Sequence, residues 1–167
     1  MSQSLFTQPR YTLTFVIVTF LWAAPDVIDS IWRRPKGNTL IVRERGSHWF
    51  IRIGLTMALF AAILLAYRQP EGTLPYHQPY LFLAGVVIVF AGFVLRRSAI
   101  YTLGRFFTID VATYTDQHVI DDPPYRRIRH PAYSGSILCL LGTGLMLGHW
   151  LGLLLIALAT VVTFGYR

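Results

Sequence analysis

The hydrophobic residues of the chain are gathered in five blocks separated by polar stretches. Blocks of close to ~20 apolar residues are typical of helices that cross the hydrocarbon core of a bilayer. The last two blocks are shorter, and only Gly148-His149-Trp150 separates them, so we expect a tight helical hairpin there. The blocks run over about Tyr11–Ala24 (followed by Pro25), Trp49–Tyr67, Pro79–Leu95, Tyr133–Leu147 and Leu151–Tyr166.

Composition supports the same interpretation. The chain is 54% hydrophobic without counting glycine, and its mean hydropathy is +0.49, whereas soluble domains average about 45–50% apolar residues with glycine counted. The pattern therefore predicts an all-α integral membrane protein with about five transmembrane helices in a single domain over residues 1–167. We expect three spans in residues 1–103, and a loop and the hairpin in residues 104–167.

The positive charge is distributed between the blocks rather than on one face. The net charge of +7 comes from fourteen Arg and one Lys, and a nucleic-acid partner would require these to gather on a soluble surface. Successive loops carry five, one, six and no basic residues. The positive-inside rule then places the N-terminus outside and the C-terminus in the cytoplasm. We expect a bacterial inner membrane protein, and this rule disfavours a signal peptide cleaved after Ala23-Ala24.

The longest polar stretch, Gly104–Gly135, is the predicted site of binding or chemistry. Pro131 favours a helix start, because proline is common at the first helical position; His130 then occupies the cap. The free N–H groups of such a start bind anions, and Arg126 and Arg129 lie nearby in the sequence. Anchoring of these arginines to anionic lipid headgroups explains them equally well.

Other chemistry finds little support in the sequence. His118 and His130 are far apart and lack companion ligands, so we expect no metal site. Ser134-Gly135 lacks the elbow motif of serine hydrolases, and Cys139 is the single cysteine. Asp121-Asp122, which precede two prolines, predict a solvated turn. Three glycines at four-residue spacing predict close packing of the hairpin helices; they are Gly144, Gly148 and Gly152.

An ordered series of short motifs runs through the polar stretch. It begins with Leu103-Gly104 and Phe106-Phe107-Thr108, continues with His118-Val119 and Pro124-Tyr125, and ends with Arg129-His130-Pro131-Ala132-Tyr133-Ser134-Gly135. In this order, the motifs resemble the isoprenylcysteine carboxyl methyltransferase family and are similar to the related membrane phospholipid methyltransferases. The resemblance covers about residues 95–167.

The resemblance implies a membrane methyltransferase that uses S-adenosyl-L-methionine. Its substrate would be the carboxylate of a lipophilic or isoprenylcysteine-like molecule, or alternatively the amine of a phospholipid. By match to the motifs, the cofactor-binding residues would be His118, Val119, Tyr125, Arg129, His130 and Tyr133. Arg129 and His130 would be the candidates for positioning, and the catalytic residues are not identified.

Two departures from the family pattern bear on activity. Pro123 stands where the family has glycine, and the chain stops at Arg167, where the family continues into a pair of glutamates and another helix. We therefore expect this chain to lack a segment that closes the cofactor site. A non-catalytic membrane scaffold that retains the fold stays an alternative. A transporter is less favoured, because the blocks hold almost no charge apart from Arg52.

Overall fold

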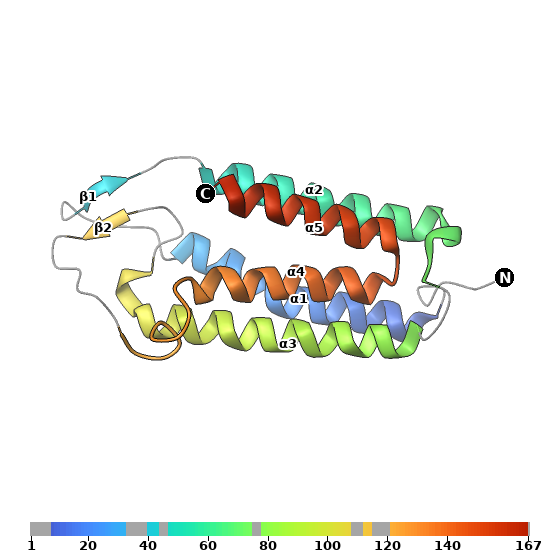
Figure 1. Cartoon of the computed structure of the whole chain (residues 1–167), viewed down its shortest axis with the longest axis horizontal. Helices are drawn as coiled ribbons and strands as arrows, with labels where there is room; N and C mark the ends of the chain where they lie inside the picture. Colours follow the sequence, from blue (N-terminus) through green and yellow to red (C-terminus); the bar gives the residue numbers. More distant parts are fainter. Residues whose placement is uncertain are drawn as a thin grey trace.

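The computed structural model describes residues 8–32, 40–43, 47–74, 78–107, 112–114 and 121–166. Five α-helices form a bundle in which successive helices run in opposite directions (Figure 1). They are α1 (Pro9–Trp32), α2 (Ser47–Arg68), α3 (Gln78–Leu103), α4 (Pro131–Leu147) and α5 (Trp150–Tyr166). The prediction of a helical membrane fold is confirmed.

Three of the helices are long and apolar enough to cross a bilayer by length and composition. These are α1, α2 and α3, and the shorter α4 and α5 of 17 residues each are also apolar. Large side chains such as Phe20, Phe60 and Phe90 are more than half exposed. A surface of this kind is suited to lipid, because lipid tails are as apolar as the side chains.

Two predicted helix ends are wrong. Helix α1 does not stop at Ala24 but runs through Pro25 to Trp32, and α3 passes Leu95 and ends at Leu103. Membrane helices tolerate an internal proline, because neighbouring groups compensate for the missing hydrogen bond. The charged residues in the extension of α3 are paired with α1, as described below. The predicted start of α4 at Pro131 and the predicted bounds of α2 and α5 agree with the structure to within two residues.

Glycines bring the backbones of α3 and α4 into contact. A Cβ atom added at Gly85 or Gly142 would lie 2.7–2.8 Å from the carbonyl oxygen of the other glycine. The same reciprocal contact, at 2.7 Å, joins Gly92 and Gly135. Each helix thus carries two glycines seven residues apart on the face that meets its partner. This antiparallel arrangement extends the small-residue packing that is common between membrane helices.

The predicted hairpin of α4 and α5 is present, but its glycines serve different purposes. Gly144 packs against Leu153 of α5, whereas Gly152 faces Ala62 of α2. Gly148 ends α4 in the left-handed region with φ of 60°, a conformation that favours glycine. The sequence prediction that all three pack the hairpin is therefore correct only for Gly144.

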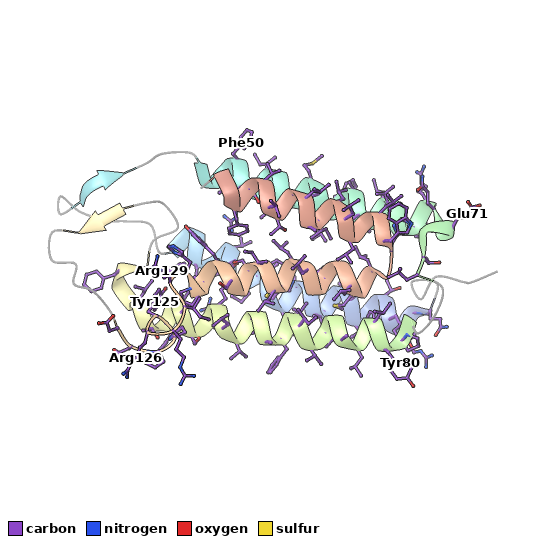
Figure 2. The ribbon with its side chains drawn as sticks, in the orientation of Figure 1. Phe50, Glu71, Tyr80, Tyr125, Arg126 and Arg129 are labelled. Carbon is purple, nitrogen blue, oxygen red and sulfur yellow. The ribbon has the colours of Figure 1, made fainter. Side chains whose placement is uncertain are left out.

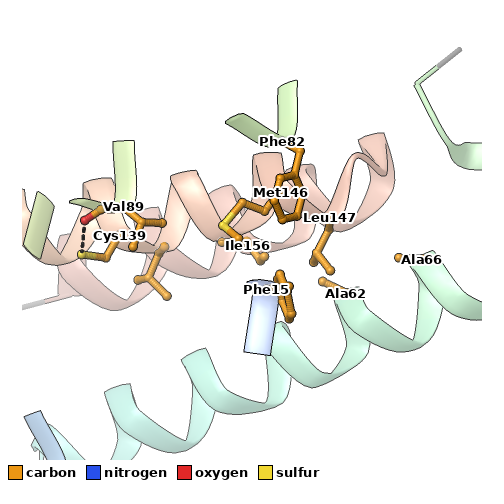
Figure 3. Close-up of a cluster of buried hydrophobic side chains, with 10 residues drawn as sticks. Phe15, Ala62, Ala66, Phe82, Val89, Cys139, Met146, Leu147 and Ile156 are labelled. Carbon is orange, nitrogen blue, oxygen red and sulfur yellow. Dashed lines mark hydrogen bonds between the residues drawn. The ribbon is translucent and has the colours of Figure 1, made fainter. Parts of the chain in front are cut away.

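The apolar core lies where α5 and α4 meet the other helices. Figure 3 shows Phe82 and Met146 side by side, with Phe15, Leu147 and Ile156 nearby. Helix α5 also runs alongside α2 (Figure 1). The core thus joins α1 and α5 and fixes α4 within the bundle.

Two short strands add a feature that the sequence analysis did not predict. Strand β1 (Leu40–Arg43) pairs with β2 (Ala112–Tyr114) in an antiparallel ribbon, whose register is irregular between Leu40 and Val42. The ribbon lies at the end of the bundle where α4 begins (Figure 1). Two short 3-10 helices, Pro70–Gly72 and Gly104–Phe106, follow α2 and α3.

Candidate functional site

The first turn of α4 is the centre of the candidate site. His130 is the N-cap residue and Pro131 follows it at the first helical position, as the sequence predicted. The His130 side chain makes no capping hydrogen bond, while its carbonyl oxygen accepts from Ser134 N–H at 3.0 Å and from Ser134 Oγ at 3.1 Å. The helix start is therefore organised by its backbone and is not closed by its own cap side chain.

A compact turn carries Tyr125 to this helix start. The carbonyl oxygen of Asp122 accepts from the N–H groups of Tyr125 (2.9 Å) and Arg126 (3.4 Å), and the Pro123-Pro124 peptide bond is cis. Thr102 at the end of α3 donates its hydroxyl to the Pro123 carbonyl oxygen at 3.1 Å. Asp121 and Asp122 are exposed, which confirms the predicted solvated turn.

Tyr125 is half-buried, and its environment shifts its titration. Burial raises the pKa of the Tyr125 phenol, the Arg96 guanidinium lowers it, and the neighbouring Tyr133 raises it, with an upward net shift. The Thr102–Pro123 hydrogen bond places this turn at the end of α3, and a hydrogen bond from Arg96 to the Ala132 carbonyl oxygen joins α3 to the first turn of α4.

Aromatic rings line the start of α4. The His130 ring stacks on Tyr133 with centroids 5.8 Å apart, and Tyr133 meets Phe164 of α5 at 5.5 Å. Such a surface suits a flat ring system or a soft cation, since aromatic faces attract both. Phe164 is not among the site residues predicted from the sequence, and its contact with Tyr133 adds α5 to this surface.

The turn that precedes this surface carries exposed arginines. Arg126, Arg127 and Arg129 are all solvent-exposed, and Figure 2 shows Tyr125, Arg126 and Arg129 at the end of the bundle where α4 begins. Together with the positive end of the α4 dipole, they favour a negatively charged ligand.

A partly buried ion pair lies directly beneath the α4 start, and the sequence analysis missed it. Arg96 Nε of α3 donates to both carboxylate oxygens of Asp26 in α1, at 2.8 and 2.9 Å. Arg96 Nη1 donates to the Ala132 carbonyl oxygen at 2.9 Å and to Ser136 Oγ at 2.6 Å. We call Asp26, Arg96, Ala132 and Ser136 the Arg96 cluster.

Two further arginines tie α1 to its neighbours at the same end. Arg97 Nη1 donates to Asp29 Oδ2 at 2.5 Å, and Arg52 of α2 donates to the Asp26 carbonyl oxygen at 3.2 Å. The useful signal in the sequence was the pair of acidic residues, three apart, after the first hydrophobic block, together with adjacent arginines after the third. The sequence analysis counts the two arginines among the loop charges and does not consider the acidic pair.

Of the predicted cofactor-binding residues, the structure brings four to one place. Tyr125, Arg129, His130 and Tyr133 lie in the turn before α4 and in its first turn. His118 and Val119 lie outside the described residues, so their predicted role stays a prediction.

The apolar helices of the described residues define a polytopic membrane protein. Its candidate site is polar and rich in arginine, and it lies where the chain enters α4. The family model for phospholipid methyltransferase matches residues 80–167, which is more than half of the chain. The chain belongs to this family, and the resemblance noted in its sequence is confirmed.

Named relatives agree with this membership. A probable protein-S-isoprenylcysteine O-methyltransferase of Oryza sativa is 42% identical over 77 residues, covering 44% of this chain and 40% of that protein. Protein-S-isoprenylcysteine O-methyltransferase B of Arabidopsis thaliana is 35% identical over 65 residues, or 38% and 33% of the two chains. Protein-S-isoprenylcysteine O-methyltransferase of Schizosaccharomyces pombe is 26% identical over 139 residues, which cover 78% of this chain and 59% of that protein.

The chain thus covers between a third and three fifths of the length of these relatives. No solved structure matches it.

Proposed function

We propose that this chain is an S-adenosyl-L-methionine-dependent membrane methyltransferase that methylates the carboxylate of a lipophilic, isoprenylcysteine-like substrate. The observation that carries the proposal is the first turn of α4, where an uncapped helix start, a stacked His130–Tyr133 pair and exposed arginines meet. Membership in a methyltransferase family and the names of the relatives support it.

The residues at this place fit the chemistry of S-adenosylmethionine. The helix start and Arg129 would hold its carboxylate, and the His130–Tyr133 surface would hold its adenine ring or the sulfonium cation. When bound, this cofactor supplies an activated methyl group on a positively charged sulfur. His118 and Val119 would complete the site by the family motif.

The role of the protein in this reaction would be orientation. A carboxylate is already ionised near pH 7, so no general base is required. Alignment of the acceptor oxygen with the methyl group would supply most of the rate. Because the opposite charges of the two reactants disappear in the reaction, exclusion of water by the apolar helices would favour it.

A second candidate acceptor is the amine of a phospholipid, and the description of the matching family favours it. An ammonium group must lose a proton before it can accept a methyl group. Transfer to an amine should therefore accelerate as the pH rises from 6 to 9, whereas transfer to a carboxylate should stay nearly constant. Rates measured for both acceptors over this range distinguish the two.

For the orientation in the membrane, we propose that the α4 start faces the cytoplasm, where the cofactor is made available. The distribution of arginines supports this orientation by the positive-inside rule. The named relatives are plant and fungal proteins, so they give no support to the bacterial inner membrane that we expected.

Cofactor affinity tests the proposal. Titration calorimetry of the purified chain in nanodiscs should detect binding of S-adenosylmethionine, and both Arg129→Ala and His130→Ala should weaken it by roughly tenfold, the cost of one charge-assisted hydrogen bond. Arg68→Ala, an exposed arginine that ends α2 at the opposite end of the bundle, should leave the affinity unchanged. Equal affinity of the wild type and both site variants would refute the assignment.

A further inference from the structure

The hydrogen bonds of Arg96 connect α1 to the first turn of α4. Its Nε contacts Asp26 of α1, while its Nη1 contacts Ala132 and Ser136 of α4. Ala132 immediately precedes Tyr133 of the candidate site. Arginine is suited to this task, because its planar guanidinium directs separate N–H groups to separate acceptors.

The backbones of α3 and α4 are also in contact at this level. A Cβ atom on Gly135 would lie 2.7 Å from both the N and the Cβ atoms of Arg96. The side chain of Arg96 is 15% exposed and that of Asp26 is 21% exposed. The α4 start therefore lies directly against α3, and its first turn accepts two hydrogen bonds from the largely buried guanidinium.

The charge balance of the cluster supports a role for the site. A cation near the start of a helix opposes the helix dipole, so Arg96 alone would be unfavourable beside Ala132. Asp26 neutralises it, since both of its carboxylate oxygens accept from the Arg96 Nε–H group. The cluster therefore fixes the helix start without adding net charge and leaves the positive end of the dipole available to a ligand.

We propose that Arg96 is a positioning residue, which holds the first turn of α4, and with it His130 and Tyr133, in the geometry that binds the methyl donor. This inference rests on the proposed function. It names a residue that lies outside the matched loop motifs and acts through the helix rather than by touching the cofactor.

Arg97 provides a matched control. It is adjacent to Arg96 on α3, and it also pairs with an acidic residue of α1, Asp29. Among the described residues, its hydrogen bonds reach Asp29 and no residue of α4. Replacing either arginine by lysine keeps the charge and one contact to α1, but only Arg96→Lys removes the separate donors to α4.

The experiment measures the affinity of the full chain in nanodiscs for S-adenosylmethionine, together with kcat and KM. Arg96→Lys should raise Kd and KM by roughly tenfold or more, because small displacements of binding groups are costly, and should change kcat less. Arg97→Lys should match the wild type in both constants. Equal Kd values for Arg96→Lys and the wild type would overturn the inference and leave the proposed function intact.

Hydrogen–deuterium exchange of residues 131–137 gives a reading that needs no cofactor. Arg96→Lys should speed exchange in this segment while α5 retains its wild-type protection, which also shows that the variant is folded. If the wild type binds no S-adenosylmethionine, the proposed function fails. Faster exchange confined to the α4 start would then still support positioning by Arg96, and unchanged exchange would overturn it.

Discussion

The two ends of the bundle use buried polar groups in different ways. At the α4 start, the Arg96 cluster joins charged groups of α1 and α3 to the α4 backbone, and exposed arginines surround it. At the opposite end, the fully buried His149 joins the hairpin to the loop after α2. There, His149 Nδ1 accepts from Gly152 N–H at 3.2 Å and Nε2 lies 3.0 Å from the Gln69 carbonyl oxygen.

Because Nδ1 accepts a hydrogen bond from Gly152, Nε2 is the ring nitrogen left to donate to the Gln69 carbonyl oxygen. The loop reinforces it: Leu74 N–H donates to the Gly148 carbonyl oxygen at 3.0 Å, and Thr73 pairs with His149 in an isolated antiparallel bridge. The His149 end is thus closed by hydrogen bonds to backbone groups. Among the described residues, the ion pairs lie at the other end, which also carries the candidate site.

The largest effect should come from breaking the ion pair at the charged end. Asp26→Asn leaves the guanidinium of Arg96 without its charged partner, and for a pair that is only partly buried the loss lies toward the lower end of the roughly 3–5 kcal/mol of a fully buried pair. The free energy of unfolding in mixed micelles, measured by denaturant titration, should fall by an amount in this range. Glu71→Gln, an exposed acidic residue at the His149 end, should change it little. Equal stability of the two variants would contradict the structural role of the pair.

A smaller effect is expected at the His149 end. A Cβ atom at Gly72 would lie 2.2 Å from His149 Nε2, so Gly72→Ala must displace the ring, and forced repacking of this kind costs about 1–3 kcal/mol. Thermal denaturation should show the loss, while the affinity for S-adenosylmethionine should stay at the wild-type value. Gly165→Ala, where an added Cβ meets nothing within 4 Å, is the control. A loss of cofactor affinity in Gly72→Ala would show that the two ends are not independent.

The smallest effect concerns Tyr125. Its pKa is raised above the ordinary value of 10.0, chiefly by burial, against the opposing effect of Arg96. The neutral phenol is therefore favoured in the folded protein. The stability it contributes is fully present below about pH 10, the pKa of an unfolded tyrosine, and is lost as the pH rises through the folded pKa.

Absorbance near 295 nm is titrated against pH for the wild type and for Tyr125→Phe, and the difference between the two curves reports the ionisation of Tyr125. The midpoint of this difference should lie above the pKa of free tyrosine. Arg96→Gln should move it further upward, because it removes the lowering effect of the guanidinium. A shift in the opposite direction would contradict the described proximity of Arg96 to Tyr125.

Local rules account for the features that the sequence predicted correctly. Proline fixes a backbone angle that suits the first position of a helix, which is why Pro131 marked the start of α4 and placed His130 at the cap. Block lengths gave the number and order of the helices. Both signals are local: each can be read from one continuous segment of the sequence.

Contacts between distant residues account for the rest. Pro25 lies within α1 rather than after it, and Arg96 and Arg97 lie within α3, because Asp26 and Asp29 of α1 pair with those arginines. Nothing in either segment alone reveals that the two charged pairs meet. The reciprocal glycines of α3 and α4 were missed for the same reason, since Gly85 and Gly92 become informative only once their partners are known.

The glycine contacts between α3 and α4 also bear on how the bundle is assembled during synthesis. Helix α3 is made before α4, and the whole stretch from Gly104 to His130 must be translated between them. Until α4 enters the bilayer, the glycines of α3 lack the backbone that they contact in the folded protein. Helix α2 lacks its main partner for longer, because α5 is made after α4. The closest packing of this fold is therefore a late event in membrane insertion, and the early helices must persist in the bilayer without their main partners.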